Sequence, residues 1–519
     1  EDLEESLKVL YLITEKLGAK MTILNYRDGK NGLIGEILIM REVEVKNKLE
    51  IKIGLIGEEK CGKSTLVGVL VTDKLDNGSG LASKNVFRHK HEVICGKTSS
   101  FTHQIVGFDE NGKMTNHSFF GKLSWPQIVD QSAKIVNFYD LGGSEKALKS
   151  SIKSLSPNYL DYLAIVVSAS SGITNDTVVF LKMALAMELP VIIIVTKLDL
   201  LEEEDKLLFL NNLKYIIKAQ NSKRNLLVAK SQEDIVMFPR MMKESIIPIF
   251  LLSNTTGKGL DLFINFLNLL PTNAPTLTNY DNKTNIQFDI HSIITKEIKP
   301  EKLSVDYTPC TSNMNPNQDN INFISNTSNT MNNNISNSNT NNIEQKVILA
   351  GILSQGSIEK YSSLLIGPDL KGLFKTVNIK SIYCKKIEVK KVFKGQYCTL
   401  EVDIKENEIR KGMVLLDQES LPRASKIFEA ELWNIGDKEI KLLSDKTQFV
   451  VSSGHIRQMA TVKSKNTGEE KGEITIKPEE KKPLILEFCF NPEYLKPGSH
   501  LIVLDHSYKF YGLVTKLIN

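Results

Sequence analysis

The residues that could do chemistry begin with a glycine-rich loop, GEEKCGKS, from Gly57 to Ser64. It fits the pattern G-x-x-x-x-G-K-[ST], in which glycines, here Gly57 and Gly62, let backbone N–H groups curl around phosphates. Lys63 can reach phosphate oxygens, and the hydroxyl of Ser64 can bind Mg²⁺. An apolar strand precedes the loop and a helix follows it, so the phosphates would lie at a helix N-terminus. Thr65 belongs to the same expected contact set.

A second pattern, D-x-x-G, runs from Asp140 to Gly143 directly after an apolar run. The carboxylate of Asp140 can hold the Mg²⁺ shell, and the N–H of Gly143 can turn toward a γ-phosphate. Thr98, at the end of the stretch CGKT, is expected on a switch segment that closes on the same ion. The predicted metal set is therefore Ser64, Thr98 and Asp140.

Two later patterns address the nucleotide base. In VTKLD, Asp199 can accept two hydrogen bonds from guanine, and the stem of Lys197 can lie over the base. Adenine offers no matching pair of donors, so this pattern selects GTP over ATP. In LLSNTTG, the backbone near Ser253 and Asn254 could meet the guanine oxygen. Thr196 completes the expected nucleotide-contacting set.

These motifs must be positioned by a regular framework, and the sequence predicts one. Helical patterns separate most of the continuous apolar runs at 51–56, 135–139, 163–168, 190–195 and 247–252. Short apolar strands that alternate with helices indicate a mostly parallel sheet covered on both faces. We therefore predict a doubly wound α/β P-loop G domain over residues 47–272.

Beyond this domain the pattern changes to short strands of period two with glycine-containing turns, which is typical of antiparallel β-barrels. Two barrels are expected, at 283–417 and 420–519. An insert rich in Asn, Ser and Thr, at about 300–344, is predicted to be disordered because it cannot bury enough apolar area to offset its ordering entropy. Residues 1–46 predict a small α/β extension.

Bulk composition narrows the class of protein. The chain has 519 residues, a formal charge of +4 and 41% hydrophobic residues. This mildly basic balance permits RNA contact without requiring it. The six cysteines include no C-x-x-C pair, which favours reduced thiols over a zinc site or a disulfide framework. No apolar run reaches the ~18 residues of a membrane span, and the N-terminal segment is unlike a secretory signal. We expect a cytoplasmic protein with no membrane or DNA partner.

On these motifs and on longer stretches, the chain resembles the GTP-binding protein 1 and 2 family of elongation-factor-Tu-type translational GTPases. The resemblance covers nearly the whole chain apart from the loop around 295–345. Its most distinctive stretches are FRHKHE (87–92), DLGGSEKALK (140–149), LLIGPDLKGLF (364–374) and SSGHIRQMATV (452–462). It implies a G domain and two β-barrels, GTP or GDP with Mg²⁺, and GTP hydrolysis. It also implies aminoacyl-tRNA and the ribosome as partners, or association with the mRNA-decay machinery.

Three departures from the family pattern cluster at the expected chemistry. Ser144 stands where the family has its catalytic histidine, and a hydroxyl does not titrate near neutral pH. Loss of a water-positioning group commonly costs about 10²–10⁴ in rate. Lys60 replaces an aspartate that helps to hold a monovalent cation in the wider class; its ammonium could stand in for that cation, or could simply be solvated. Glu59 replaces a valine and could orient the water, although a triphosphate would repel it. With Thr98, these residues form the candidate catalytic set.

Other residues allow more than one interpretation. His89 and His91 could swing toward the water, or serve the switch structure or RNA; no cysteine or carboxylate cluster accompanies them, as a metal site would require. His455 suggests only packing or tRNA contact. Basic residues on the first barrel could meet RNA phosphates or form a solvated face. These are Lys385, Lys386, Lys390 and Lys391.

Two functions from different classes follow. The first is a translational-type GTPase that binds aminoacyl-tRNA or the ribosome in its GTP state and hydrolyses GTP slowly on its own because of Ser144. The second is a nucleotide-gated RNA- or ribosome-binding protein with little or no hydrolysis. The retained Mg²⁺ ligands favour the first, and Ser144, Lys60 and Glu59 favour the second. A guanine-specific regulator unconnected to translation is opposed by the two barrels.

Overall fold

The computed structural model describes most of the chain. The described residues are 7, 9–11, 13–14, 19–29, 32–41, 48–87, 89–99, 102–118, 121–143, 159–220, 224–242, 245–271, 285–297, 345–463, 473–505 and 507–518. Ser144 and the predicted insert at about 300–344 lie outside these residues.

A seven-stranded sheet forms the centre of the G domain, with strand order β10-β11-β9-β8-β3-β7-β4. All neighbours are parallel except β4, which pairs antiparallel with β7. The five predicted apolar runs are all strands, and β4 and β10 are added at the two edges. The bounds are β3 (Leu49–Ile56), β4 (Thr102–Phe108), β7 (Lys134–Asp140), β8 (Tyr162–Ser168), β9 (Val191–Thr196), β10 (Asn225–Val228) and β11 (Ile246–Leu251).

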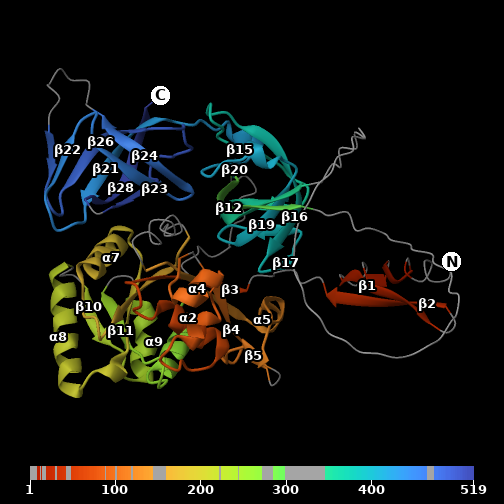
Figure 1. Cartoon of the computed structure of the whole chain (residues 1–519), viewed down its shortest axis with the longest axis horizontal. Coiled ribbons are helices and arrows are strands. Elements are labelled where there is room, and N and C mark those ends of the chain that lie inside the picture. The colour runs from red at the N-terminus through yellow and green to blue at the C-terminus, as the bar shows by residue number, and fades with distance from the viewer. Residues whose placement is uncertain are drawn as a thin grey trace, which may run out of the picture.

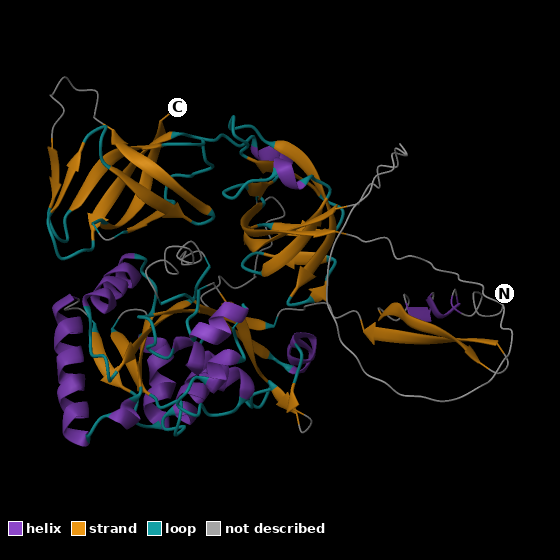
Figure 2. Cartoon of the chain, in the orientation of Figure 1, coloured by secondary structure: helices purple, strands orange, loops and turns teal. Residues whose placement is uncertain are grey.

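Helices cover both faces of this sheet (Figures 1 and 2). Along β9, Ile192 and Ile194 join one buried cluster, whereas Ile193 and Val195 join the other. A sheet that is apolar on both faces is what the predicted doubly wound architecture requires, and the structure confirms it. The helices are α2 (Lys63–Thr72), α3 (Leu81–Lys84), α4 (Lys90–Cys95), α5 (Trp125–Gln131), α7 (Asn175–Ala186), α8 (Glu203–Gln220), α9 (Gln232–Met241) and α10 (Leu260–Leu269).

The next part of the chain forms an antiparallel barrel, here called barrel II. Its order is β15-β20-β12-β13-β19-β16, and pairing of β15 with β16 closes it. The strands are β12 (Gln287–Glu297), β13 (Gln345–Gln355), β15 (Ser363–Gly367), β16 (Lys375–Cys384), β19 (Tyr397–Val402) and β20 (Val414–Leu416). Shorter strands accompany them, namely β14 (Ser357–Glu359), β17 (Ile387–Glu388) and β18 (Lys391–Phe393).

The last part forms a second closed antiparallel barrel, here called barrel III, in the order β21-β26-β24-β23-β27-β28. The predicted fold class, a G domain followed by two antiparallel barrels, is therefore confirmed. The strands are β21 (Ile427–Asn434), β23 (Gln448–Ser453), β24 (Ile456–Lys463), β26 (Lys481–Phe488), β27 (His500–Leu504) and β28 (Lys509–Ile518), with a ribbon of β22 (Ile440–Leu443) and β25 (Glu473–Ile476) beside them.

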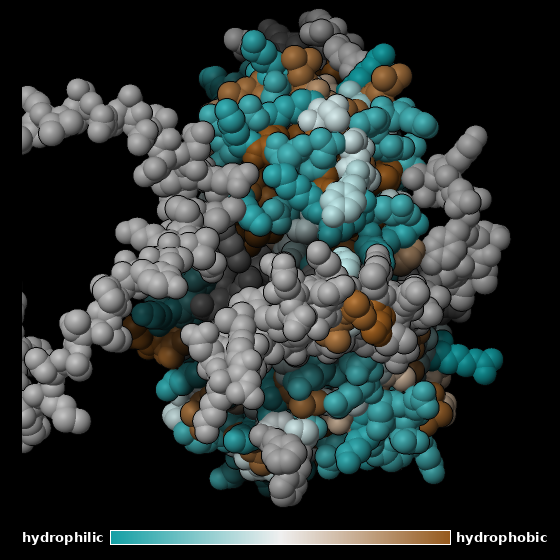
Figure 3. All heavy atoms as spheres, turned by 90° about the vertical axis from the view of Figure 1, so that its right-hand side faces the viewer, coloured by the Kyte–Doolittle hydropathy of each residue, from teal (hydrophilic) through white to brown (hydrophobic). Residues whose placement is uncertain are grey.

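Near the N-terminus, β1 (Ala19–Gly29) and β2 (Gly32–Arg41) pair as an antiparallel hairpin, drawn in red in Figure 1. On the molecular face that Figure 3 presents, hydrophilic residues predominate over the described surface and hydrophobic ones form small separate patches. Among the described helices, none has the length and apolar composition that a membrane crossing requires.

Barrel III packs directly on the G domain beside α7, as Figure 1 shows. Ile435, Ile502 and Tyr511 of the barrel belong to the same buried cluster as the strands and helices of one G-domain face. The side chain of Lys182 on α7 is 8% exposed, and its ammonium lies 3.6 Å from Asp437 and 3.4 Å from Glu479 of the barrel. The two domains therefore share one apolar core with charged contacts beside it.

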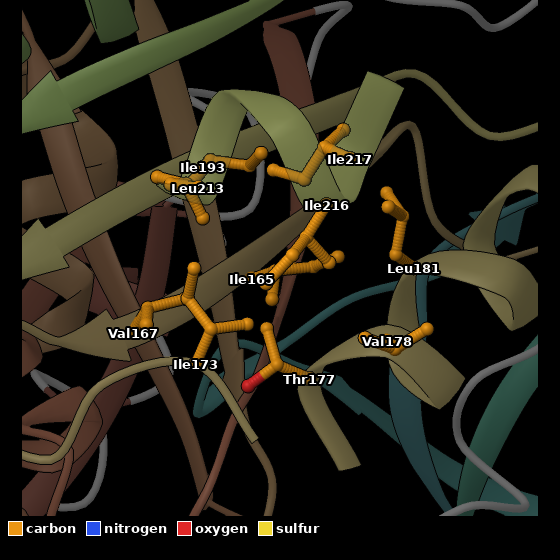
Figure 4. A pocket seen from close by; sticks show the side chains of 10 residues that line it. All are labelled: Ile165, Val167, Ile173, Thr177, Val178, Leu181, Ile193, Leu213, Ile216 and Ile217. Atoms are coloured by element: carbon orange, nitrogen blue, oxygen red, sulfur yellow. The ribbon is translucent and has the colours of Figure 1, made fainter. Parts of the chain in front are cut away.

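The same face of the G domain contains a small apolar cavity of about 10 Å³ between the sheet and helices α7 and α8 (Figure 4). Its lining is aliphatic apart from the hydroxyl of Thr177. A space of this size is at most that of one water molecule, so it is a packing gap in the core and not a ligand site.

Candidate functional site

The phosphate loop connects β3 to α2 and depends on close backbone approach. A Cβ on Gly57 would lie 2.3 Å from the carbonyl oxygen of Val166, so the loop can pass β8 only with glycine there. Gly62 is the N-cap of α2 with φ of 98°, and no side chain caps the helix. The first-turn N–H groups of α2 are thus available to an anion, as the glycine-rich pattern predicts.

Lys63, the first residue of α2, is 5% exposed and turned back onto the loop. Its ammonium donates to the carbonyl oxygens of Gly57 at 2.9 Å and Glu58 at 2.7 Å. A buried ammonium held by two loop carbonyls is placed to meet phosphate oxygens in the same loop. Thr65 follows on the same helical turn and is half-buried.

The three residues of the predicted metal set meet in the structure. The Ser64 hydroxyl lies 2.6 Å from the Thr98 hydroxyl and 2.5 Å from Asp140 Oδ2. Asp140 ends β7 and is 1% exposed. Its other oxygen, Oδ1, is buried and has no hydrogen-bond partner among the described residues. Because a buried carboxylate oxygen without a partner is costly, this set of oxygens fits a hard cation such as Mg²⁺.

The electrostatics of the set agree with that fit. Burial raises the pKa of Asp140 to about 6, although the nearby Lys63 ammonium and the Ser64 hydrogen bond act in the opposite direction. A divalent cation would supply the opposite charge that a buried carboxylate requires. Among the described residues, no group of three or more His, Cys, Asp or Glu side chains is arranged to hold a metal ion. A magnesium site here would therefore use hydroxyls and one carboxylate.

The base-recognition motifs converge on the phosphate loop. Thr196 at the end of β9 donates from its hydroxyl to the Cys61 carbonyl at 2.5 Å. A Cβ on Gly62 would lie 3.5 Å from the side-chain nitrogen Nδ2 of Asn254, so the motif LLSNTTG also borders the phosphate loop. Asp199 Oδ2 accepts a hydrogen bond from the Thr255 hydroxyl at 3.1 Å. The structure thus brings all three segments to one edge of the sheet.

Asp199 is exposed and ionised, as a guanine acceptor must be. Burial opposes its charge, but hydrogen bonds from Ser253 and Thr255 outweigh that effect and lower the pKa of the carboxyl. Lys197 adopts φ of 59°, which turns the chain sharply between Thr196 and Asp199. Sequence reasoning missed Thr255, although its hydroxyl two residues after Ser253 is visible in the motif SNTT.

Gly143 ends the D-x-x-G pattern in direct contact with the phosphate loop. A Cβ added to it would lie 2.7 Å from each of three atoms: the carbonyl oxygen of Glu58, the backbone nitrogen of Glu59 and the ammonium of Lys63. Only glycine allows this approach. Ser144 follows but lies outside the described residues, so its substitution for histidine stays a sequence-based prediction.

The two departures in the phosphate loop have different environments. Glu59 forms an ion pair with Lys97, with 2.7 Å between the ammonium and Oε1, and its side chain is 32% exposed. Lys60 is exposed and adopts a left-handed backbone with φ of 62°. The structure therefore gives Glu59 a partner in the switch segment, and the roles of both residues in hydrolysis stay predictions.

Sequence reasoning missed a buried carboxylate beside the switch. Glu92 on α4 is fully buried. Its Oε1 accepts from the backbone N–H and the hydroxyl of Ser99, both at 2.8 Å, and its Oε2 accepts from the N–H of His89 at 3.1 Å. His91 Nε2 lies 2.7 Å from the same Ser99 hydroxyl. The available signal was the capping-box spacing of an acid three residues after the N-cap.

The lysines of barrel II are engaged within the protein. Both interpretations of Lys385 from the sequence are wrong, because its side chain is 4% exposed and forms an ion pair with Glu50 of β3 at 2.5 Å. The Lys386 ammonium lies 5.1 Å from the ring centroid of Trp125. Two of these lysines therefore join barrel II to the G domain.

His455 lies where all three domains meet. Its Nδ1 is 3.1 Å from Asp289 Oδ1 of barrel II, and Asp289 also accepts hydrogen bonds from Tyr159 of the G domain and from Ser354. Burial opposes ionisation of Asp289, but the hydrogen bonds and charge of His455, with the two hydroxyls, hold the pKa of that carboxyl below its usual range. His455 thus serves domain contact, one of its two predicted roles.

Comparison with known proteins agrees with this geometry. The model of the family described as "Elongation factor Tu GTP binding domain" matches residues 48–276. GTP-binding protein 1 of Xenopus laevis is 29% identical over 521 residues, which cover 100% of this chain and 71% of that protein. GTP-binding protein 2 of Homo sapiens is 29% identical over 529 residues, which cover 99% of this chain and 78% of that protein.

Two solved structures share the fold at low sequence identity. The bacterial selenocysteine-specific elongation factor EF-Sec has a TM-score of 0.56 at 15% identity, and the match covers 90% of this chain and 58% of that one. The GTP-bound GTPase-like domain of S. cerevisiae Ski7 has a TM-score of 0.58 at 12% identity, covering 91% of this chain and 98% of that one. The present chain thus spans somewhat more than half of the first neighbour.

Proposed function

We propose that the chain, whose residues 48–276 match the model of the elongation factor Tu GTP-binding domain, binds GTP with Mg²⁺ and engages aminoacyl-tRNA and the ribosome in its GTP state. The observation that carries the proposal is the meeting of Ser64, Thr98 and Asp140, together with a buried Oδ1 of Asp140 that has no hydrogen-bond partner among the described residues. The three residues come from the phosphate loop, the switch segment and the end of β7. Few functions other than a nucleotide–metal site require these segments to converge.

Each residue has a defined task in this proposal. Lys63 and the first-turn N–H groups of α2 bind phosphate oxygens, and Asp199 accepts the guanine donors. Ser64, Thr98 and Asp140 would hold Mg²⁺, which neutralises charge on the β- and γ-phosphates when bound. Gly143 lies against the phosphate loop, where its N–H can report the presence of a γ-phosphate. Loss of that phosphate would release Thr98 and Gly143, which is the usual ordering change of a GTPase switch.

Intrinsic hydrolysis is proposed to be slow, because Ser144 cannot position water as an imidazole does. The ribosome is the proposed partner that completes the site, and the mRNA-decay machinery is the alternative partner class. The likeness of fold to a selenocysteine-specific elongation factor supports a translational partner. The alternative function, a nucleotide-gated binder with little or no hydrolysis, is favoured by the pairing of Glu59 with Lys97, which removes one candidate for orienting the water.

Single-turnover GTP hydrolysis, measured with and without ribosomes, tests the proposal. The natural protein and the variant Ser144→His are compared, with GTP and GDP affinities measured for both. Acceleration of the natural protein by ribosomes of about 10² or more supports a working GTPase. If it binds GTP but stays inert with ribosomes, and only Ser144→His gains turnover, the nucleotide-gated alternative holds. If it binds no guanine nucleotide, both proposals fail.

A further inference from the structure

Three consecutive residues of the switch segment are held by three different partners. Lys97 pairs with Glu59 of the phosphate loop, Thr98 contacts Ser64, and Ser99 is bound by Glu92 of α4. Thr98 is the residue that closes on the metal in the proposed function. The residues on either side of Thr98 are therefore both held by other parts of the chain: Lys97 by the phosphate loop and Ser99 by α4.

The connection between Glu92 and Ser99 depends on a sharp reversal of the chain. Gly96 ends α4 with φ of 64°, and its N–H donates to the Glu92 carbonyl at 2.8 Å. The chain then turns back, so that Ser99 meets the carboxylate seven residues before it. The carboxylate takes both the N–H and the hydroxyl of Ser99 on one oxygen and the N–H of His89 on the other.

The Glu59–Lys97 ion pair and the hydrogen bonds between Glu92 and Ser99 differ in strength. The Glu59–Lys97 pair is open to solvent, with side chains 32% and 53% exposed, and exposed pairs contribute little. Glu92 is fully buried and uses both oxygens for charge-assisted hydrogen bonds, which are roughly twice as strong as neutral ones. Removing this carboxylate also takes away the acceptor of the N–H groups of His89 and Ser99. Glu92 is therefore expected to dominate the placement of this segment.

We propose that Glu92 is a positioning residue for the nucleotide site: it fixes Ser99 and thereby holds Thr98 beside Ser64 at the metal position. This gives a role to the FRHKHE stretch, in which His89 and His91 complete the hydrogen bonding around the carboxylate. The inference rests on the proposed GTP-dependent function. It adds that the preference for GTP over GDP is set partly by a carboxylate that need not touch nucleotide or metal.

The test measures affinities of the full chain for fluorescent GDP and for a fluorescent non-hydrolysable GTP analogue over a range of Mg²⁺ concentrations. The variants are Glu92→Gln, Thr98→Ala and the double variant, with Glu110→Gln as an exposed carboxylate control. Glu92→Gln keeps the shape but replaces one acceptor oxygen by a donor. It should weaken GTP-analogue binding about tenfold, the loss of ~1.4 kcal/mol, change GDP binding less than about twofold, and raise the Mg²⁺ requirement.

Comparing Glu92→Gln in the natural and Thr98→Ala backgrounds distinguishes a positioning role of Glu92 from a merely structural one. If Glu92 acts through Thr98, Glu92→Gln should cost less than about twofold in the Thr98→Ala background. An equal loss in both backgrounds, an equal loss for GDP and GTP analogue, or no loss at all would each overturn the inference.

Should Glu92→Gln fail to fold, Ser99→Ala removes the hydroxyl contact with little change in shape, and Ser99→Thr should restore GTP preference. No preference change in Ser99→Ala would also overturn the inference. Failure of the natural protein to prefer the GTP analogue in the presence of Mg²⁺ would instead refute the proposed function, so the two failures are distinguishable.

Discussion

Gly143→Ala is the substitution whose effect follows most directly from the structure. The added methyl group would lie 2.7 Å from Glu58 O, Glu59 N and Lys63 Nζ. Carbon contacts become favourable at about 3.5 Å, so the backbone at Gly143 must retreat by about 0.8 Å or more. Two of the three atoms belong to the loop backbone, which β8 restrains behind Gly57. The end of β7 therefore has to move away from the phosphate loop.

A displacement near 1 Å of a group at a reacting site can lower the reaction rate on the order of 10²-fold. Because GDP has no γ-phosphate for Gly143 to meet, we expect Gly143→Ala to lower affinity for a GTP analogue by about 10–100-fold, or ~1.4–2.7 kcal/mol, and to change GDP affinity less than about threefold.

Competition with a fluorescent nucleotide at fixed Mg²⁺ measures both affinities. The matched control is Gly436→Ala in barrel III, where a new Cβ would meet its nearest atom, Asn434 Oδ1, at 3.3 Å. Unchanged GTP preference in Gly143→Ala would refute the claim that close approach of this glycine carries the nucleotide signal.

Three further variants test other parts of the molecule. Asp199→Asn should lower GTP affinity by about tenfold or more and improve binding of xanthosine triphosphate, whose 2-oxo group replaces the guanine amine; competition with both nucleotides measures this. Lys385→Met leaves Glu50 without its ion-pair partner and should destabilise the protein by about 3–5 kcal/mol in urea unfolding, whereas the control Lys386→Met should cost about 1 kcal/mol or less. Asp289 has a lowered pKa, so its stabilisation is present above the unfolded value of about 3.9 and lost below it. Between about pH 5 and pH 3 the free energy of unfolding should therefore fall more steeply in the natural protein than in Asp289→Asn; parallel profiles would contradict this.

The framework of the G domain is readable from the sequence where strands are buried on both faces. The two edge strands are not, for physical reasons. β4, THQIVGF, begins with three polar residues, of which His103 and Gln104 are half-buried, and so shows only a short apolar run. β10 has only four residues, and Leu227 within it is 40% exposed. Edge strands need less apolar surface, so the pattern that reveals central strands is weak in them.

The residues of the site likewise include some that local sequence motifs predict and others that they do not. The phosphate, metal and base motifs are local, and most of their residues lie at strand ends, so their convergence follows from the parallel sheet. Thr98 lies instead on the segment between α4 and β4. The partners that come from distant parts of the chain do not appear in any local pattern. The sequence alone suggests that Lys385 is a solvated charge, because its partner Glu50 lies 335 residues away in the chain. Glu92 reads as one more charge in a polar stretch, although it is fully buried.

The apolar core shared by the G domain and barrel III has a consequence for synthesis. The G domain ends near residue 271, and Tyr511, which helps to cover its face beside α7, follows about 240 residues later. Translation proceeds at about 5–20 residues per second, so Tyr511 is synthesised on the order of 10–50 s after the last residue of the G domain. During this interval the nascent chain presents an uncovered aliphatic surface. Chaperone dependence, aggregation of truncated products and the behaviour of an isolated G domain should all trace to this one face.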